Sequence, residues 1–367
     1  MKQSAMSPRT GRIIELDIAK GLGILSVILY HTLPASPLHT ALGGYMMPLF
    51  FVVSGLVMQR DACSFSLRRF WEKNARLLFY YILFSAIYLL CSAVTCIAGN
   101  GSCKALALDG IAALVGCGFN VLWFFSACFW QHALQSAHRQ PAAPLGTRVV
   151  PGRAVFAGSR YRQSRGLYRP VRRGPGAGHG RADGSSPHGG GLLSVYRFPA
   201  ARCVSFFAKQ CTKPAMVAAC GIGGTVLTVG CGLLAQAAPQ DMYDLTASRP
   251  LLSLAAVALG CAGILGISLA LGKVPMLNKG LAYLGVHALY LMAIHNQPNL
   301  YGWLNKLSVK LCAGLPGWYM QGMFFLLLTV AALIIAMGLE PRLDPAVRAL
   351  VRRCTGQRKE QTNPERS

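Results

Sequence analysis

Three ionisable side chains, Asp17, Lys20 and His31, interrupt the first apolar stretch of this 367-residue chain, DIAKGLGILSVILYHTLP. Lys20 and His31 are eleven residues apart, which on a helix is three turns plus about 20° at roughly 100° per residue. Asp17 precedes Lys20 by one turn, so all three project close to one stripe. A charge at membrane depth costs on the order of 3 kcal/mol. Either the stripe performs chemistry, with the imidazole of His31 as a proton acceptor, or it holds a snorkelling lysine and a boundary histidine.

The composition predicts an all-α polytopic transmembrane helix bundle. The chain is 53% hydrophobic and only 13% charged, which excludes an ordinary soluble protein. Its apolar residues form blocks long enough to cross a bilayer. We predict eight spans, at about 18–36, 41–58, 77–98, 108–130, 215–236, 250–271, 280–298 and 321–338.

The distribution of basic residues predicts the orientation of these spans, because Lys and Arg accumulate on the cytoplasmic side. Basic residues precede the first span, follow the second and the sixth, and follow the last, whereas the loop at 237–249 holds Asp241, Asp244 and a single Arg249. We therefore expect a multi-pass protein of the bacterial cytoplasmic (inner) membrane with both termini in the cytoplasm. Lys20 would then lie toward the inner face and His31 toward the outer face.

The thirteen cysteines are scattered and include no Cys-x-x-Cys pair. We interpret them as small packing residues, and we predict neither a disulfide framework nor a metal site.

Residues 132–202 differ from the rest of the chain. They hold twelve Arg, no Lys, twelve Gly, seven Pro and one acidic residue, Asp183. No part of the segment could span a bilayer, because Gly and Pro break helices and Arg recurs too often. Three interpretations remain: a disordered basic loop, an Arg/Gly-rich nucleic-acid-binding insert, or a reading-frame shift between about Trp130 and Phe206. The abrupt edges and the absence of Lys favour the third, so we expect no nucleic-acid partner.

These features predict four regions along the chain. Residues 1–130 form an N-terminal transmembrane half, and 131–206 form the Arg/Gly/Pro-rich segment. Residues 207–340 form a C-terminal transmembrane half, and 341–367 form a basic cytoplasmic tail.

Five short runs resemble, in this order, the membrane-bound acyltransferase 3 family. The first is Leu16, Asp17, Lys20 and Gly21 with His31 ten intervening residues after Lys20. It is followed by MMPLFFVVSGLVMQR (46–60), by FSLRRFWEKNARLLFYY (65–81), by NVLWFFSACFW (120–130) and by LGVHALYLMAIHNQPNL (284–300). The family includes sugar O-acetyltransferases related to fucose 4-O-acetylase. It usually has about ten spans, so a frame shift over 132–202 would account for the two that are missing here.

The resemblance implies transfer of an acyl group, typically acetyl, from acetyl-CoA as cosubstrate to a hydroxyl of a cell-envelope sugar or polysaccharide. The implied catalytic residues are His31, Asp17 and Lys20, with His31 as general base or as transient acyl acceptor. Asp17 and Lys20 would form a pair that orients the helix or contacts the donor. No metal is implied.

Further residues are candidates for substrate binding, each with a structural alternative. Arg76 and Arg69 would bind the phosphates of CoA, although positive-inside topology alone places basic residues there. Ser54 and Trp123 would contact substrate or serve as packing residues, and His295 would line the site or sit at the membrane boundary. We interpret His287 as structural.

Two other functions remain open. The chain could be a catalytically dead or degraded copy of such an enzyme, because the unusual segment separates its two transmembrane halves. It could instead be a polytopic transporter, for which we would expect internal repeats and interrupted helices.

Overall fold

Almost all the regular structure of the described residues is helical. The computed structural model describes residues 13–58, 67–98, 102–115, 122, 127, 211, 213–241 and 246–354. Within them, the only strands are the two-residue β1 (Gln240–Asp241) and β2 (Thr246–Ala247), which pair antiparallel. The prediction of an all-α polytopic protein is confirmed. The helices are α1 (Ile14–Thr32), α2 (Pro37–Gly43), α3 (Met46–Met58), α4 (Leu67–Ile97), α5 (Cys103–Val115), α9 (Pro214–Ala237), α10 (Pro250–Leu271), α11 (Pro275–Val286), α12 (Ala288–Ile294), α13 (Pro298–Leu311) and α14 (Gly317–Cys354).

Proline sets several of the helix boundaries. It stands at the first turn of α2, α9, α10, α11 and α13, where its missing N–H costs nothing. At α2 the Ser36 hydroxyl also accepts a hydrogen bond from the backbone N–H of His39, at 3.2 Å. The first helix ends at Thr32, because Leu33 precedes Pro34 and adopts an extended backbone.

Five segments of the described residues are long and apolar enough to cross a membrane. They are Pro37–Leu56, Leu77–Ile97, Pro214–Ala237, Pro250–Leu271 and Gly317–Arg353. These correspond to five of the eight predicted spans. The first predicted span, at α1, is not among the five, and this helix carries Glu15, Asp17 and Lys20 in its first two turns. The span predicted at 108–130 is described as a helix only to Val115.

The span predicted at 280–298 is not one continuous helix. α11 ends at Val286, His287 separates the two helices, and α12 continues for only seven residues. Six of those seven residues are buried. α12 therefore lies inside the bundle, as a short helix with a histidine at each end, His287 and His295.

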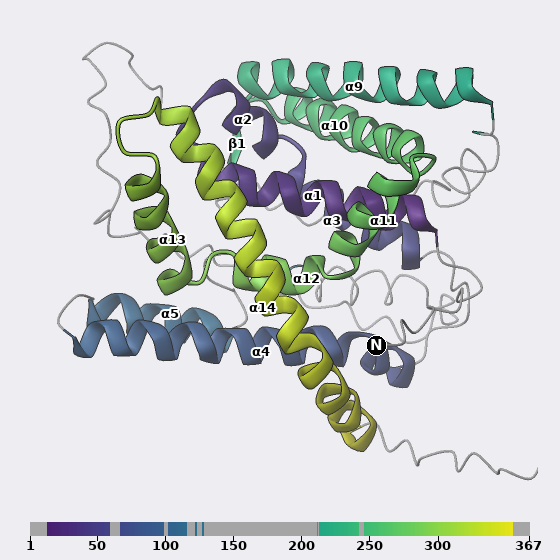
Figure 1. The fold of residues 1–367 in the computed structure, drawn as a ribbon. Helices are drawn as coiled ribbons and strands as arrows, with labels where there is room; N and C mark the ends of the chain where they lie inside the picture. The colour runs from purple at the N-terminus through teal and green to yellow at the C-terminus, as the bar shows by residue number, and fades with distance from the viewer. Residues whose placement is uncertain are drawn as a thin grey trace, which may run out of the picture.

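The first helix lies at the centre of the arrangement. α1 contacts α2, α3, α10, α11, α12 and α14. In Figure 1 the α9–α10 pair lies on one side of α1 and the α4–α5 hairpin on the other, and these helices run in roughly the same direction. α14 crosses them diagonally, and α13 lies crosswise at the end where α4 turns into α5.

Glycines allow the closest helix contacts. A Cβ on Gly21 of α1 would overlap the backbone of Leu281 in α11, and a Cβ on Gly285 of α11 would overlap the carbonyl oxygen of Asp17. α9 and α10 meet in the same way, since a Cβ on Gly224 would lie 2.6 Å from the carbonyl oxygen of Gly263. Small residues let helix backbones approach in a lipid environment, where no hydrophobic effect drives them together.

The structure corrects the interpretation of the cysteines as packing residues alone. Cys96, at the end of α4, and Cys103, at the start of α5, form a disulfide that closes the α4–α5 hairpin. Sequence spacing gives no signal for this bond, because the turn that brings the two cysteines together is a property of the hairpin.

One of the predicted region boundaries can be compared with the helices. The boundary predicted between 340 and 341 falls inside α14, which continues to Cys354 with Asp344 and Val347 buried. The start of the predicted tail is therefore helical and packed. The segment at 132–202 lies outside the described residues.

Candidate active site

Two of the predicted histidines meet at one end of the bundle. His31 is in the last turn of α1, and His295 follows the last residue of α12. Their ring centroids lie 5.2 Å apart, with the ring planes inclined by 44°. Because the break at His287 lets α12 enter the bundle as a separate helix, residues 264 positions apart in sequence become neighbours. We refer to His31 and His295 as the histidine pair.

His295 is fully buried and has an unused ring nitrogen. Its Nδ1 lies 3.0 Å from the carbonyl oxygen of Leu291, which can only accept a hydrogen bond, so Nδ1 carries the proton of the neutral ring. Nε2 is then an acceptor. It is buried and has no hydrogen-bond partner among the residues that the structure describes. Such a group normally has a partner, so this nitrogen is available to a ligand or a water.

Aromatic and polar neighbours hold the histidine pair in place. The Tyr301 hydroxyl of α13 donates a hydrogen bond to the backbone carbonyl of His31, at 2.7 Å. Tyr30 packs edge-on against the His31 ring and stacks on His39 of α2, with centroids 3.8 Å apart. Two positions after His295, Gln297 donates from Nε2 to the carbonyl of Ala293, and its Oε1 is buried without a partner in the described part of the chain. Two unused acceptors therefore come from the same short segment.

The other predicted catalytic residues lie at the opposite end of α1. Lys20 Nζ is 3.7 Å from Asp17 Oδ1, and only 7% of Asp17 is exposed. The close approach of α11 at Gly285 covers the backbone of Asp17. A rise of 1.5 Å per residue separates Lys20 from His31 by about 16 Å along the helix. The stripe predicted from the sequence therefore faces protein at both ends.

The remaining predicted residues are not all placed. Ser54 is half-buried on α3, and the contacts described for the histidine pair and for Asp17 do not include it. Arg69 and Arg76 belong to α4, but their side chains lie outside what the structure describes, as does Trp123 altogether.

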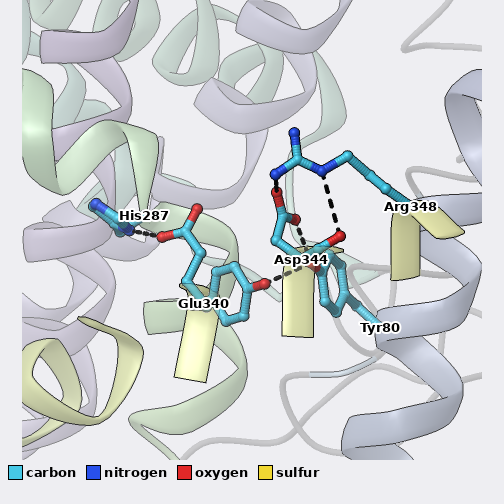
Figure 2. A network of polar contacts seen from close by, with 6 residues as sticks. Tyr80, His287, Glu340, Asp344 and Arg348 are labelled. Atoms are coloured by element: carbon cyan, nitrogen blue, oxygen red, sulfur yellow. Dashed lines mark hydrogen bonds and ion pairs between the residues drawn. The ribbon is translucent and has the colours of Figure 1, made fainter. Parts of the chain in front are cut away.

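A second polar cluster joins α4, α12 and α14, and the sequence analysis did not find it. Tyr290 of α12 donates to the Tyr80 hydroxyl of α4 at 2.5 Å, and Tyr80 donates to Asp344 Oδ1 of α14 at 2.6 Å. Arg348 Nη2 lies 2.8 Å from Asp344 Oδ2. Figure 2 shows how Arg348 and Tyr80 converge on the Asp344 carboxylate.

One helical turn before Asp344, Glu340 forms an ion pair with Nδ1 of His287, at the break between α11 and α12 (Figure 2). We refer to Tyr80, His287, Tyr290, Glu340, Asp344 and Arg348 as the α14 cluster. His287 is therefore a partner of a carboxylate. Two carboxylates four residues apart at the end of a long apolar run were the available sequence signal, but the predicted tail boundary at 341 separated them.

Comparison with known proteins relates the N-terminal part of the chain to a protein family. Residues 13–134 match the model of the acyltransferase 3 family, described as an acyltransferase domain. The N-terminal third of this chain is similar to an acyltransferase domain. No curated protein and no solved structure matches the chain.

The matched segment spans α1 to α5 and includes Asp17, Lys20 and His31. The similarity and the apolar helices together support a membrane acyltransferase. His295 and most of the α14 cluster lie outside the match, so their association with the acyltransferase-like segment comes from the structure alone. In the described residues, no group of three or more His, Cys, Asp or Glu side chains could hold a metal ion.

Proposed function

We propose that the chain is an O-acyltransferase of the bacterial cytoplasmic membrane, which transfers an acetyl group from acetyl-CoA to a hydroxyl of a cell-envelope carbohydrate. The observation that carries the proposal is the histidine pair at one end of α1, with the unpartnered Nε2 of His295 next to the His31 ring. A sugar hydroxyl is a weak nucleophile and needs a base, and imidazole is the side chain suited to that role near neutral pH.

In the proposed reaction the hydroxyl oxygen attacks the thioester carbonyl carbon, and a C–O bond forms as the C–S bond breaks. His31 takes the hydroxyl proton, and the proton passes finally to the CoA thiolate. The unpartnered Nε2 of His295 next to the His31 ring gives that proton a second acceptor. Transient acylation of His31 would use the same residues, and detection of an acyl-imidazole by mass spectrometry after rapid quenching would distinguish the two routes.

The donor would enter at the opposite end of α1, where Asp17 and Lys20 pair. Arg69 and Arg76 belong to the start of α4, and we propose them as partners for the phosphates of CoA. The separation of about 16 Å between Lys20 and His31 is comparable to the reach of an extended pantetheine arm. The thioester could therefore approach the histidine pair while the nucleotide stays at the membrane surface.

The proposed orientation places the start of α4 in the cytoplasm and its end outside. Arg60, Arg68, Arg69, Lys73 and Arg76 precede the apolar part of α4, in agreement with the positive-inside rule. The Cys96–Cys103 disulfide at the opposite end supports the same orientation, because disulfides persist in oxidising compartments such as the periplasm.

The test is acetyl transfer by the full chain in membranes supplied with labelled acetyl-CoA. We expect label in the envelope carbohydrate with the parent chain, and loss of transfer in His31→Ala although the variant still accumulates in the membrane. Undiminished transfer by His31→Ala would remove this residue from the mechanism. Absence of transfer by the parent chain would contradict the proposal and favour a degraded copy of the enzyme.

A transporter is the second candidate function, favoured by one observation. The break between α11 and α12 at His287, beside Glu340, resembles the discontinuous helices that line transporter binding sites. Sugar uptake into vesicles without consumption of acetyl-CoA would support transport. Acetyl-CoA consumption that depends on His31 would exclude it.

A further inference from the structure

The helix α13 is set apart from the spans by its direction. Two residues separate it from His295, and it lies crosswise to α1, α4 and α9, at the end of the bundle where α4 turns into α5 (Figure 1). It packs against α14 and α4. A helix that lies across the ends of membrane spans runs parallel to the membrane surface.

One face of α13 packs on the protein. Ser308 is fully buried, Tyr301 packs on Phe324 of α14, and the Tyr301 hydroxyl bonds to the carbonyl of His31. Leu300 and Leu304 lie one turn apart on this same face and pack against the apolar core.

The side of α13 that adjoins this packed face is apolar and exposed. Trp303, Leu307 and Leu311 follow one another at intervals of four residues, and so form one stripe along the helix. Their exposed fractions are 77%, 41% and 57%. A tryptophan exposed to this extent would be unfavourable in water, and nothing in the described part of the chain covers it.

A second stripe adjoins the first and is basic. Lys306 and Lys310 are also four residues apart, and both are exposed. At about 100° per residue, they lie about 60° and 20° from Trp303 around the helix axis, on the side away from Leu311. The exposed surface of α13 is therefore apolar along one edge and cationic along the next.

We propose that α13 lies in the interface of the membrane, with the Trp303–Leu307–Leu311 stripe in the boundary of the acyl chains and with Lys306 and Lys310 at the phosphates of lipid headgroups. Apolar and basic residues side by side on a surface-parallel helix are the pattern of interfacial helices. Tryptophan is enriched at this depth. Trp318 and Tyr319, which stack at 3.6 Å near the start of α14 and are 65% and 44% exposed, supply further aromatic groups just after α13.

The consequence concerns the histidine pair. Because Tyr301 is on the protein-facing side of α13 and bonds to the carbonyl of His31, a headgroup-level position for α13 sets the depth of the end of α1. The histidine pair would then open at headgroup depth, within reach of groups carried on the membrane surface.

The test uses tryptophan fluorescence of the full chain in lipid nanodiscs. The chain has five tryptophans, so the contribution of Trp303 is the difference between the parent chain and Trp303→Phe. We expect that contribution to be quenched by phospholipids brominated in the upper part of the acyl chain, and to be little affected by aqueous acrylamide. Quenching by acrylamide alone would overturn the proposal. Protection from both quenchers would also overturn it, because the stripe would then be covered by protein, such as a second copy of the chain.

Two matched variants test the stripes themselves. Leu307→Glu places a charge on the apolar stripe, and we expect most of the bromolipid quenching of Trp303 to be lost. Asn305→Glu places the same charge on an exposed position off the stripe and should leave quenching unchanged. In the double variant Lys306→Gln/Lys310→Gln, we expect brominated anionic lipid to quench Trp303 no more than brominated zwitterionic lipid does. Equal quenching in Leu307→Glu and Asn305→Glu would contradict the assigned orientation.

Discussion

At the scale of single residues, the unused nitrogen of His295 is the most specific feature of the candidate site. A buried ring nitrogen without a partner costs free energy on the order of 1–3 kcal/mol unless something binds it. Gln297 Oε1, two positions along the chain, is also buried without a hydrogen-bond partner in the described residues. The His295 group, whose ring lies against His31, indicates a place for a polar ligand such as a hydroxyl group.

The first prediction concerns His295. We expect His295→Ala to lower kcat for acetyl transfer by about 10²-fold or more, the scale of a lost acid–base group, while membrane accumulation is unchanged. Transfer assays with labelled acetyl-CoA measure the loss. His39→Phe is the matched control, because it keeps a ring stacked on Tyr30 outside the histidine pair. A similar loss in both variants would assign His295 a packing role only.

The second prediction concerns Asp344 and its two partners. Asp344→Ala removes the hydrogen bond that the buried Tyr80 hydroxyl donates to Oδ1, which should lower stability by about 1–3 kcal/mol. Arg348→Ala removes a side chain that is 55% exposed, and exposed ion pairs are worth about 1 kcal/mol or less. Thermal unfolding in detergent should therefore show the larger decrease for Asp344→Ala. The reverse order would mean that leaving the Asp344 carboxylate without Arg348 costs more than removing the carboxylate together with both of these contacts.

At the scale of elements, the contact between α1 and α11 is what places Asp17 and Lys20. The two backbones touch because Gly21 and Gly285 have no side chains. This contact cannot accommodate an added methyl group, because the atoms that the methyl group would meet belong to the backbone and not to flexible side chains.

The third prediction follows from that contact. We expect Gly285→Ala to separate α1 from α11 and to lower both thermal stability and transfer activity. Gly280→Ala is the control in the same helix, because a Cβ there meets nothing within 4 Å. It should raise stability slightly, by about 0.5–1 kcal/mol, from helix propensity alone. Equal stability of the two variants would show that α11 does not pack on α1 in this way.

At the scale of the whole molecule, the sequence predicted the spans better than the arrangement of the segments between them. Apolar blocks of about twenty residues are a strong local signal, so α4, α9, α10 and the start of α14 follow from composition. The break at His287 and the crosswise α13 do not, because both depend on which helices pack around them. The pairing of Asp17 with Lys20 was predictable from their helical spacing. The meeting of His31 with His295 was not, because it requires α12 to enter the bundle separately.

The last prediction tests the orientation that the proposed reaction requires. Acetyl-CoA is cytoplasmic and envelope carbohydrate is not, so the Lys20 end and the His31 end of α1 must face opposite compartments. α4 ends at the Cys96–Cys103 disulfide, so this bond should lie in the oxidising compartment. In intact cells, Cys96→Ser leaves the Cys103 thiol free, and a membrane-impermeant maleimide should then label it. The parent chain should be labelled at this hairpin only after reduction, and Cys96→Ser/Cys103→Ser should remain unlabelled there. Labelling of Cys96→Ser only after the cells are opened would place this end in the cytoplasm. The histidine pair would then be on the wrong side for an envelope acceptor.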